Sequence, residues 1–472
     1  MLPVNCGSHA DYQNLVVENL RKYYPNPDLL ARSTWDIIER FWHLDLSDTD
    51  TLLTHKYSKF GPAPRTPSCM QRSYLLSIDF KVSSITEWAA QLKMNPLFAI
   101  LSGFQVGDTP GVGTFYDFMK RLWDSDDPHM TSHIHPLKAK VKKPDAKGEK
   151  AASVEKVTVA ELLPQLEKTA FPLNDQPYAS LFKIYQKEFL DVSVEKGLIH
   201  KDSLALAGDG TPVVTSHRER KKRICKCKEN GINDCSCDRY FSQPDCDIGW
   251  DSSRDCFYHG YDLYMLVDSQ SDLPVFPHYS YASKHDSHGF LQAFFRMRAF
   301  LPDYKVSKVL LDSAHDAMPY YQYFKRQNIT PFIDLNGKGG RPPVYKNDFT
   351  IDKDGVPVCP SGHRMRRDGI EVAKGRMKFK CPKISHTGGC ISCTCDKPCS
   401  KAKYGRTVHL ILNDNPRLFN NPPRSSKEWK LEYNARTSAE RSNKREKLDF
   451  KLEDGRHRST KMWYCRLYHI LM

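Results

Sequence analysis

Two short apolar segments, each leading to an aspartate, constrain the fold of this 472-residue chain more than any other feature. Residues 203–211 alternate in polarity as a β-strand does, and they carry Asp209 beside a glycine. Residues 309–312, Val-Leu-Leu-Asp, read as a buried strand that ends in Asp312. A single aspartate in such a position is usually a turn or cap residue. Two of them on one rigid sheet would hold two carboxylates in fixed positions.

The segments around these aspartates predict a mixed sheet. Apolar alternation and helical periodicity predict further strands and helices, over residues 258–267, 275–281, 288–301, 316–327 and 330–335. After an interruption, residues 407–412 read as a returning strand and residues 425–450 as a long helix. The order of elements is that of a ribonuclease H-like fold, and other mixed sheets share it. The predicted class is therefore α+β or α/β.

Composition divides the chain into five parts. Residues 1–125 read as short helices, which suit either a DNA-binding domain or an ordinary helical bundle. Residues 126–160 are rich in lysine and form a basic linker, either simply solvated or in contact with phosphates. Residues 161–335 hold the first part of the predicted ribonuclease H-like core, and residues 407–472 hold its last strand and helix. Residues 336–406, too long for a plain loop, predict an inserted module.

Four residues of the predicted C-terminal helix share one face. At about 100° per residue, Tyr433, Arg436, Glu440 and Lys447 fall within about 60° of one another. A carboxylate there suits a metal ion, and the cations suit phosphates. The simpler reading is a solvated amphipathic helix.

The spacing Tyr-x2-Arg-x3-Glu-x6-Lys resembles the motif of a large group of bacterial insertion-sequence DDE transposases. Further segments that look like this family are residues 68–123, 207–211, 249–252 and 311–317. The resemblance implies a ribonuclease H-like core in which Asp209, Asp312 and Glu440 form the catalytic triad. The triad would hold two Mg²⁺ or Mn²⁺ ions, the arrangement that phosphodiester chemistry uses.

The same resemblance implies a substrate and a reaction. Tyr433, Arg436 and Lys447 would contact DNA phosphates near the cut. Water would cut double-stranded DNA at an element end, and the freed 3′-hydroxyl would attack a target phosphodiester. Related enzymes work as dimers on paired ends, so a homodimer on DNA is expected.

The charge balance agrees with a polyanionic partner. The chain carries 70 Lys and Arg against 56 Asp and Glu, a net charge of +14, which favours nucleic acid. A membrane surface is the second choice, but no apolar run approaches the roughly 18 residues of a spanning helix. The start of the chain lacks the pattern of a secretory signal. We therefore expect a cytoplasmic protein with no membrane partner.

Many of the fifteen cysteines fall in two clusters, which in a reducing compartment bind metal more often than they form disulfides. In the first cluster, two Cys-x-Cys pairs can surround one Zn²⁺: Cys225, Cys227, Cys235 and Cys237. A free-thiol hairpin and redox chemistry are the alternatives. The second cluster resembles a zinc ribbon or knuckle, and its candidate ligands are Cys359, Cys381, Cys390, Cys393, Cys395 and Cys399.

Two rival functions stand beside the transposase. One is a catalytically inactive or truncated relative that binds DNA and regulates transposition. The other is a zinc-dependent nucleic-acid-binding module of different descent, which would make the helix motif accidental. All three carboxylates of the triad are present, which favours the enzyme.

Overall fold

The structure is a computed structural model. It describes residues 7–58, 60–61, 63–125, 133–135, 157–215, 222–223, 225–233, 235, 237, 239–241, 246–337, 349–385, 392–396, 398–402, 404–457 and 459–472. Most of the predicted basic linker and Cys390 lie outside these residues.

A group of helices opens the chain, as its periodicity predicts. The longer ones are α1 (His9–Tyr23), α2 (Arg32–His43), α3 (Ser47–Leu53), α4 (Pro67–Asp79), α5 (Ile85–Met94), α6 (Pro96–Ser102) and α7 (Val112–Arg121). The Ser8 hydroxyl caps α1 by accepting a hydrogen bond from the Asp11 amide, and the Asp11 carboxylate accepts one from the Ser8 amide. This reciprocal pair satisfies amides that a helix start leaves without partners.

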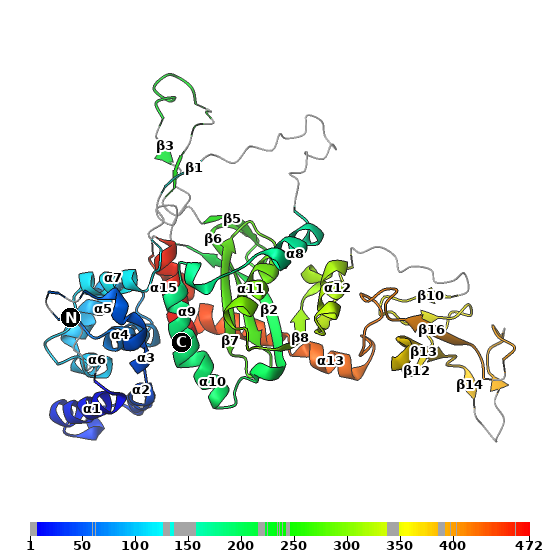
Figure 1. Ribbon diagram of the computed structural model, residues 1–472, viewed down its shortest axis with the longest axis horizontal. Helices are drawn as coiled ribbons and strands as arrows, with labels where there is room; N and C mark the ends of the chain where they lie inside the picture. Colours follow the sequence, from blue (N-terminus) through cyan, green and yellow to red (C-terminus); the bar gives the residue numbers. More distant parts are fainter. Residues whose placement is uncertain are drawn as a thin grey trace.

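A six-stranded mixed sheet forms the centre of the molecule (Figure 1). Its strands are β2 (Leu204–Val214), β5 (Asp247–Asp251), β6 (Cys256–Asp268), β7 (Pro274–Tyr281), β8 (Val306–Leu311) and β9 (Thr330–Ile333). The order is β5-β6-β2-β8-β9, and β7 also pairs with β6. β8 is parallel to β2 and to β9, whereas β6 is antiparallel to β2, β5 and β7. The protein is therefore a mixed α and β structure, as predicted.

Helices lie against both faces of this sheet. Before β2 come α8 (Val159–Lys168), α9 (Ala179–Tyr185) and α10 (Asp191–Glu195), and later α11 (Asp286–Phe300) and α12 (Met318–Arg326) precede β8 and β9 respectively.

Side chains alternate along a strand, so the two faces of β2 meet different elements. The even-numbered glycines of β2, Gly208 and Gly210, face Tyr264 and the start of α11. Asp209 and Thr211 face the C-terminal helices instead.

The prediction of one long helix over residues 425–450 is wrong in one respect, because the helical segment is divided. α13 (Lys427–Asn434) and α14 (Thr437–Lys444) are separated by two residues, and a π-helical turn, η10 (Arg445–Asp449), follows. The wider π turn shifts the residues after it around the axis. Lys447 therefore does not share the regular helical face that the sequence predicted for it.

The inserted module has its own core. β12 (Arg366–Glu371), β13 (Arg376–Lys380) and β16 (Thr407–Ile411) form an antiparallel sheet, flanked by the short strands β10 (Thr350–Ile351), β11 (Pro357–Val358), β14 (Ile384–Ser385) and β15 (Ser392–Cys393). Their apolar side chains form a cluster separate from the main core. Assigning residues 407–412 to the central sheet was wrong, because Val408 and Leu410 pack into the module's core and β16 pairs with β13.

One continuous core joins the first helices to the sheet. It runs from Tyr12 in α1 to Ile470 in α15 (Thr460–Leu471), which contacts α4, α7 and α9. Tyr464 of α15 stacks on Tyr178 with ring centres 4.9 Å apart. The helices of the predicted N-terminal domain therefore pack on the sheet as part of the same body.

A small ribbon stands out from this body at the top of Figure 1. It is inserted between β2 and β5 and consists of β3 (Lys222–Arg223) and β4 (Arg239–Phe241), with β1 (His133–His135) on the other side of β4. β1 comes from within the predicted linker. The ribbon thus joins two distant parts of the chain.

Among the helices of the described residues, none has the length and apolar character needed to cross a bilayer.

Candidate functional site

The two strand aspartates are neighbours. In the parallel pair β2–β8, Ala207 lies opposite Leu310. Continuing this register by two residues brings Asp209 level with Asp312. Adjacent strands lie about 4.8 Å apart, so the two residues extend from neighbouring backbones at the same edge. Asp209 and Asp312 thus extend from adjacent parallel strands.

Asp312 is oriented by the residues that follow it. Its Oδ1 lies 2.6 Å from His315 Nδ1 and accepts from the Ala314 amide at 3.1 Å. Burial opposes ionisation, but the His315 contact and the Ala314 hydrogen bond hold the pKa of Asp312 below its ordinary value. The buried His315 also contacts the Tyr264 hydroxyl through Nε2 at 2.9 Å. These contacts fix one face of the Asp312 carboxylate.

Glu440 approaches the pair from α14. Its charge acts on Asp209, as does that of Arg436, whose Nη2 lies 2.5 Å from Glu440 Oε1. The Glu440 side chain remains 49% exposed, so it stands at the rim of the site rather than inside it. Within the described part of the chain, these three carboxylates are not gathered as tightly as the four thiols described below.

Asp209 lies at the centre of the acidic group. The pKa of Asp209 is raised to about 7, mainly by burial and next by the charge of Asp286. Arg436 lowers this pKa, and the charges of Asp312 and Glu440 raise it more weakly. Asn443 of α14 donates to Asp209 Oδ2 at 3.4 Å. Asp286 thus influences Asp209 more than either triad partner does, although the sequence did not single it out.

A second missed aspartate, Asp262, lies beside Asp286 over Gly210. A Cβ on Gly210 would stand 2.5 Å from Asp286 Oδ1 and 3.4 Å from Asp262 Oδ1. Asp262 is buried, and its Oδ2 has no hydrogen-bond partner among the described residues. Burial and then the charge of Asp286 raise its pKa well above the ordinary value. A glycine within a strand often marks such a close approach, and this was the available signal.

The donor set fits a hard divalent cation. The charge of Asp286 acts on both Asp209 and Asp262, the charges of Asp312 and Glu440 act on Asp209, and Arg436 is the cation that opposes them at Asp209. Mg²⁺ and Mn²⁺ prefer oxygen ligands, and a bound cation would offset the mutual repulsion. Asp209, Asp312 and Glu440 are the residues that would hold it.

The three predicted phosphate contacts have different surroundings. Tyr433 is half-buried and stacks on Trp429, with ring centres 4.7 Å apart. Arg436 lies beside the carboxylates. Lys447 is turned inward, donating to the Pro212 carbonyl at 2.7 Å and lying 3.3 Å from Glu453. Of the three, Lys447 is the least available to a ligand in this conformation.

A groove of about 1300 Å³ runs past the residues next to Asp286 in the chain, His285 and Ser287. Exposed rings line it, including Trp250 and Phe257, whose centres are 4.8 Å apart. Lys284 and Arg296 also line it. Aromatic faces beside cations form a surface on which nucleic-acid strands stack.

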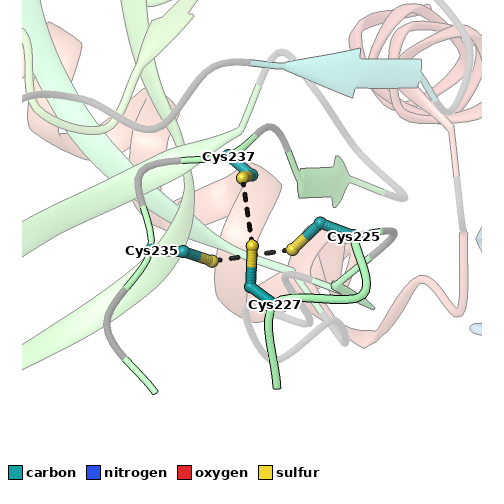
Figure 2. A group of neighbouring side chains, drawn as sticks. All are labelled: Cys225, Cys227, Cys235 and Cys237. Carbon is teal, nitrogen blue, oxygen red and sulfur yellow. Dashed lines mark hydrogen bonds between the residues drawn. The ribbon is translucent and has the colours of Figure 1, made fainter. Parts of the chain in front are cut away.

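The first cysteine cluster is tightly gathered (Figure 2). The Sγ atoms of Cys225 and Cys235 are 3.5 Å apart, and those of Cys227 and Cys237 are 3.6 Å apart. All four sulfurs lie within 4.8 Å of one another, and none forms a disulfide. This group can hold a metal ion such as zinc.

The second cluster is only partly visible. Cys359 and Cys381 are buried, and Cys399 is half-buried. Burial, then the nearby Cys359 and Cys381, raise the pKa of Cys399, so three predicted ligands share one region. Cys395 is half-buried in the following loop, the Cys393 side chain is not described, and Cys390 lies outside the described residues. In the parts that are described, the first cluster alone has its ligand atoms within 4.8 Å.

No protein-family model matches the chain, and no curated protein matches it significantly.

Proposed function

We propose that the protein is a DNA transposase that cleaves phosphodiesters at insertion-element ends and transfers the strand to target DNA. The observation that carries this proposal is the meeting of Asp209 and Asp312 on adjacent parallel strands with Glu440 of α14 beside them. Three carboxylates from distant parts of the sequence then converge on one edge of the sheet.

The topology supports a ribonuclease H-like core. Counting β2 as the first strand, the order β7-β6-β2-β8-β9 reads third, second, first, fourth, fifth. Only the second strand runs against the others. The acidic residues stand on the first strand, after the fourth and on the helix region after the fifth, as the predicted triad requires.

Each protein group has a role in this reaction. Two divalent cations on the carboxylates would activate the attacking oxygen and stabilise the leaving one. Asp209, the most buried of the triad, anchors the site, and His315 keeps Asp312 ionised and oriented. A water oxygen bonds to phosphorus, the bond to the 3′ oxygen breaks, and that oxygen leaves protonated. The resulting 3′-hydroxyl then attacks a phosphodiester of the target DNA, so that a new bond to phosphorus forms and the target's own 3′ oxygen leaves.

The partner follows from charge and surface. The net charge of +14 favours a polyanion, and Arg436 stands where a scissile phosphate would approach. The groove lined by Trp250, Phe257 and Lys284 offers stacking and cationic contacts to a nucleic-acid strand. A homodimer on paired DNA ends is part of the proposal by resemblance to the family.

An inactive DNA-binding relative is the alternative. Two observations favour it: Glu440 is paired with Arg436, and Lys447 is held by Pro212 and Glu453. In an active enzyme, Glu440 would have to leave its ion pair with Arg436 and bind a divalent metal ion instead.

Strand cleavage separates the two functions. Element-end DNA with Mg²⁺ or Mn²⁺ is incubated with the parent chain, Asp209→Ala, Glu440→Ala and the control Asp251→Asn, which alters a buried aspartate that caps a loop through Ser253. We expect cleavage to fall by at least about 10³-fold in both triad variants and to persist in the control. Equal cleavage by all four proteins would remove the proposed site, and DNA binding without cleavage would leave the regulator.

A further inference from the structure

The structure assigns a structural Zn²⁺ to Cys225, Cys227, Cys235 and Cys237, and we infer that this ion holds the projecting ribbon of β1, β3 and β4 together. This inference is independent of the proposed cleavage reaction. It also selects among the readings that the sequence left open, namely zinc, a free-thiol hairpin and redox chemistry.

Sulfur spacing is the first argument. A tetrahedral ion with Zn–S bonds of about 2.3 Å separates its sulfurs by about 3.8 Å. The Sγ atoms of Cys225 and Cys235 lie 3.5 Å apart, those of Cys227 and Cys237 lie 3.6 Å apart, and all four sulfurs fall within 4.8 Å of one another. These separations are close to a tetrahedral set and far from the roughly 2.05 Å of a disulfide. Figure 2 shows the four side chains converging from two chain segments on one point.

Ligand type is the second argument. Four thiols select zinc over hard cations such as Mg²⁺ and Ca²⁺. A site with four protein ligands leaves no open position for a substrate, so its role is structural. The nearby Cys246 and Cys256 are outside the group: Cys246 is buried before β5, and Cys256 is exposed at the start of β6.

The weakness of the ribbon itself is the third argument. Among the described residues, β3 pairs with β4 through two residue pairs, Lys222 with Tyr240 and Arg223 with Arg239, and β1 adds three pairs on the other side of β4. A sheet of such short strands needs a hydrophobic face or a packed helix to be stable by itself. Within the described residues of the loop from 225 to 237, the side chains are exposed apart from the cysteines. A metal crosslink at the end of the ribbon supplies what a core would otherwise provide.

The ion also affects a distant segment. β1, His133–His135, pairs with β4 directly, Ile134 lying opposite Tyr240. β4 begins two residues after Cys237. Releasing the metal would free β4 and, with it, the only sheet contact that the described part of residues 126–156 makes. The zinc thus orders an arm built from two separate parts of the chain.

Metal content and arm protection test the inference together. The full chain is purified, its zinc is measured by mass spectrometry, and Co²⁺ is then exchanged into it. The parent should carry one equivalent of zinc more than Cys227→Ser/Cys237→Ser, and the difference cobalt spectrum should show the visible bands of tetrahedral thiolate coordination. Cys256→Ser, which changes an exposed cysteine outside the group, is the matched control and should keep the parent's zinc content.

Chelation of the parent tests the structural role without a substitution. Removing zinc should accelerate amide exchange at least tenfold in 133–135 and 239–241, while β2 and β6 keep their protection. Equal zinc in the parent and the double variant would overturn the metal site. A chain lighter by four hydrogens would instead identify two disulfides. Unchanged exchange after complete zinc removal would overturn the structural role.

Discussion

Asp209 has a strongly raised pKa, whereas the pKa of its neighbour Asp312 is lowered. The charge of Asp286 raises the pKa of Asp209, and the buried Asp262 lies beside Asp286; sequence reasoning anticipated neither aspartate. Asp262 lies in the middle of β6, where alternation does not tell which neighbours a polar residue will meet. Asp286 starts α11, where an acidic residue is ordinary because it complements the helix dipole. Asp209 and Asp312 were predictable because short apolar strands lead to both.

The raised pKa of Asp209 predicts a pH effect on stability. The folded pKa is about 7 against an ordinary 3.8, so its contribution is full below about pH 4 and is lost as pH rises through 7. Without divalent cations, Asp209→Asn should therefore be more stable than the parent at pH 8, by up to about 4 kcal/mol, and similar near pH 4. Urea unfolding at both pH values measures this.

Asp251→Asn is the control of opposite sign. Burial opposes ionisation of Asp251, but hydrogen bonds from Ser253 and Arg254 lower its pKa overall. Its contribution is present above the ordinary pKa, so this variant should be less stable than the parent at pH 8. An Asp209→Asn protein that is also less stable at pH 8 would contradict the prediction.

At the scale of elements, the sequence predicted which strands and helices form but not always which sheet a strand belongs to or where a helix is divided. The strand at 407–412 exists, yet the same alternation serves either sheet, and only the packing of Val408 and Leu410 decides between them. The helix at 425–450 exists as well. No glycine or proline marks its division at Ala435 and Arg436, whose backbone angles remain helical. The effect of the π turn on Lys447 was likewise unreadable.

Glu188 gives a prediction at this scale. It belongs to the π turn η5 (Gln186–Leu190), and its Oε1 accepts from the Thr49 amide and hydroxyl at 2.8 and 2.7 Å, near the start of α3. Burial raises its pKa to about 8. Glu188→Ala leaves the buried Thr49 amide without this acceptor and should cost about 1–3 kcal/mol.

Glu188→Gln keeps an acceptor and serves as the matched control. It should resemble the parent near pH 4, where the group is protonated in both the folded and the unfolded parent, and increasingly exceed it in stability as pH rises to about 8, because the unfolded parent ionises while the buried carboxyl stays protonated. Denaturant unfolding at pH 4 and pH 9 measures both variants. Equal stability of the alanine variant and the parent would show that α3 does not need this contact.

At the scale of the whole molecule, two bodies of unequal size meet at a charged contact. The inserted module has its own apolar cluster, whereas the first helices share the core of the sheet. Arg417, just after the module's last strand, binds the fully buried Asp316 carboxylate through Nε at 2.8 Å and Nη2 at 2.6 Å. The sequence predicted the module but gave no sign of this link.

Arg417→Ala should loosen the module. Among the described residues, it leaves the Asp316 carboxylate with the Tyr321 hydroxyl and the Asn336 amide, and a buried carboxylate that loses its cation should cost about 3 kcal/mol of stability. Amide exchange should accelerate across 349–419 and stay unchanged in β2 and β6. Arg366→Ala, at an exposed arginine of β12, is the control. Equal exchange in all three proteins would show that the link is not needed.

The continuous core between α1 and α15 sets a geometric limit on any DNA that the protein handles. Because α15 packs on α4 and α7 and its Tyr464 also contacts Tyr279 of β7, a sequence gripped by the first helices would lie at one set distance from Asp209. In the proposed transposase, this fixed distance would set the position of the cut. The position of its cut would be counted in base pairs from the recognised sequence, and inserting a few pairs between the two would move the cut without weakening the grip.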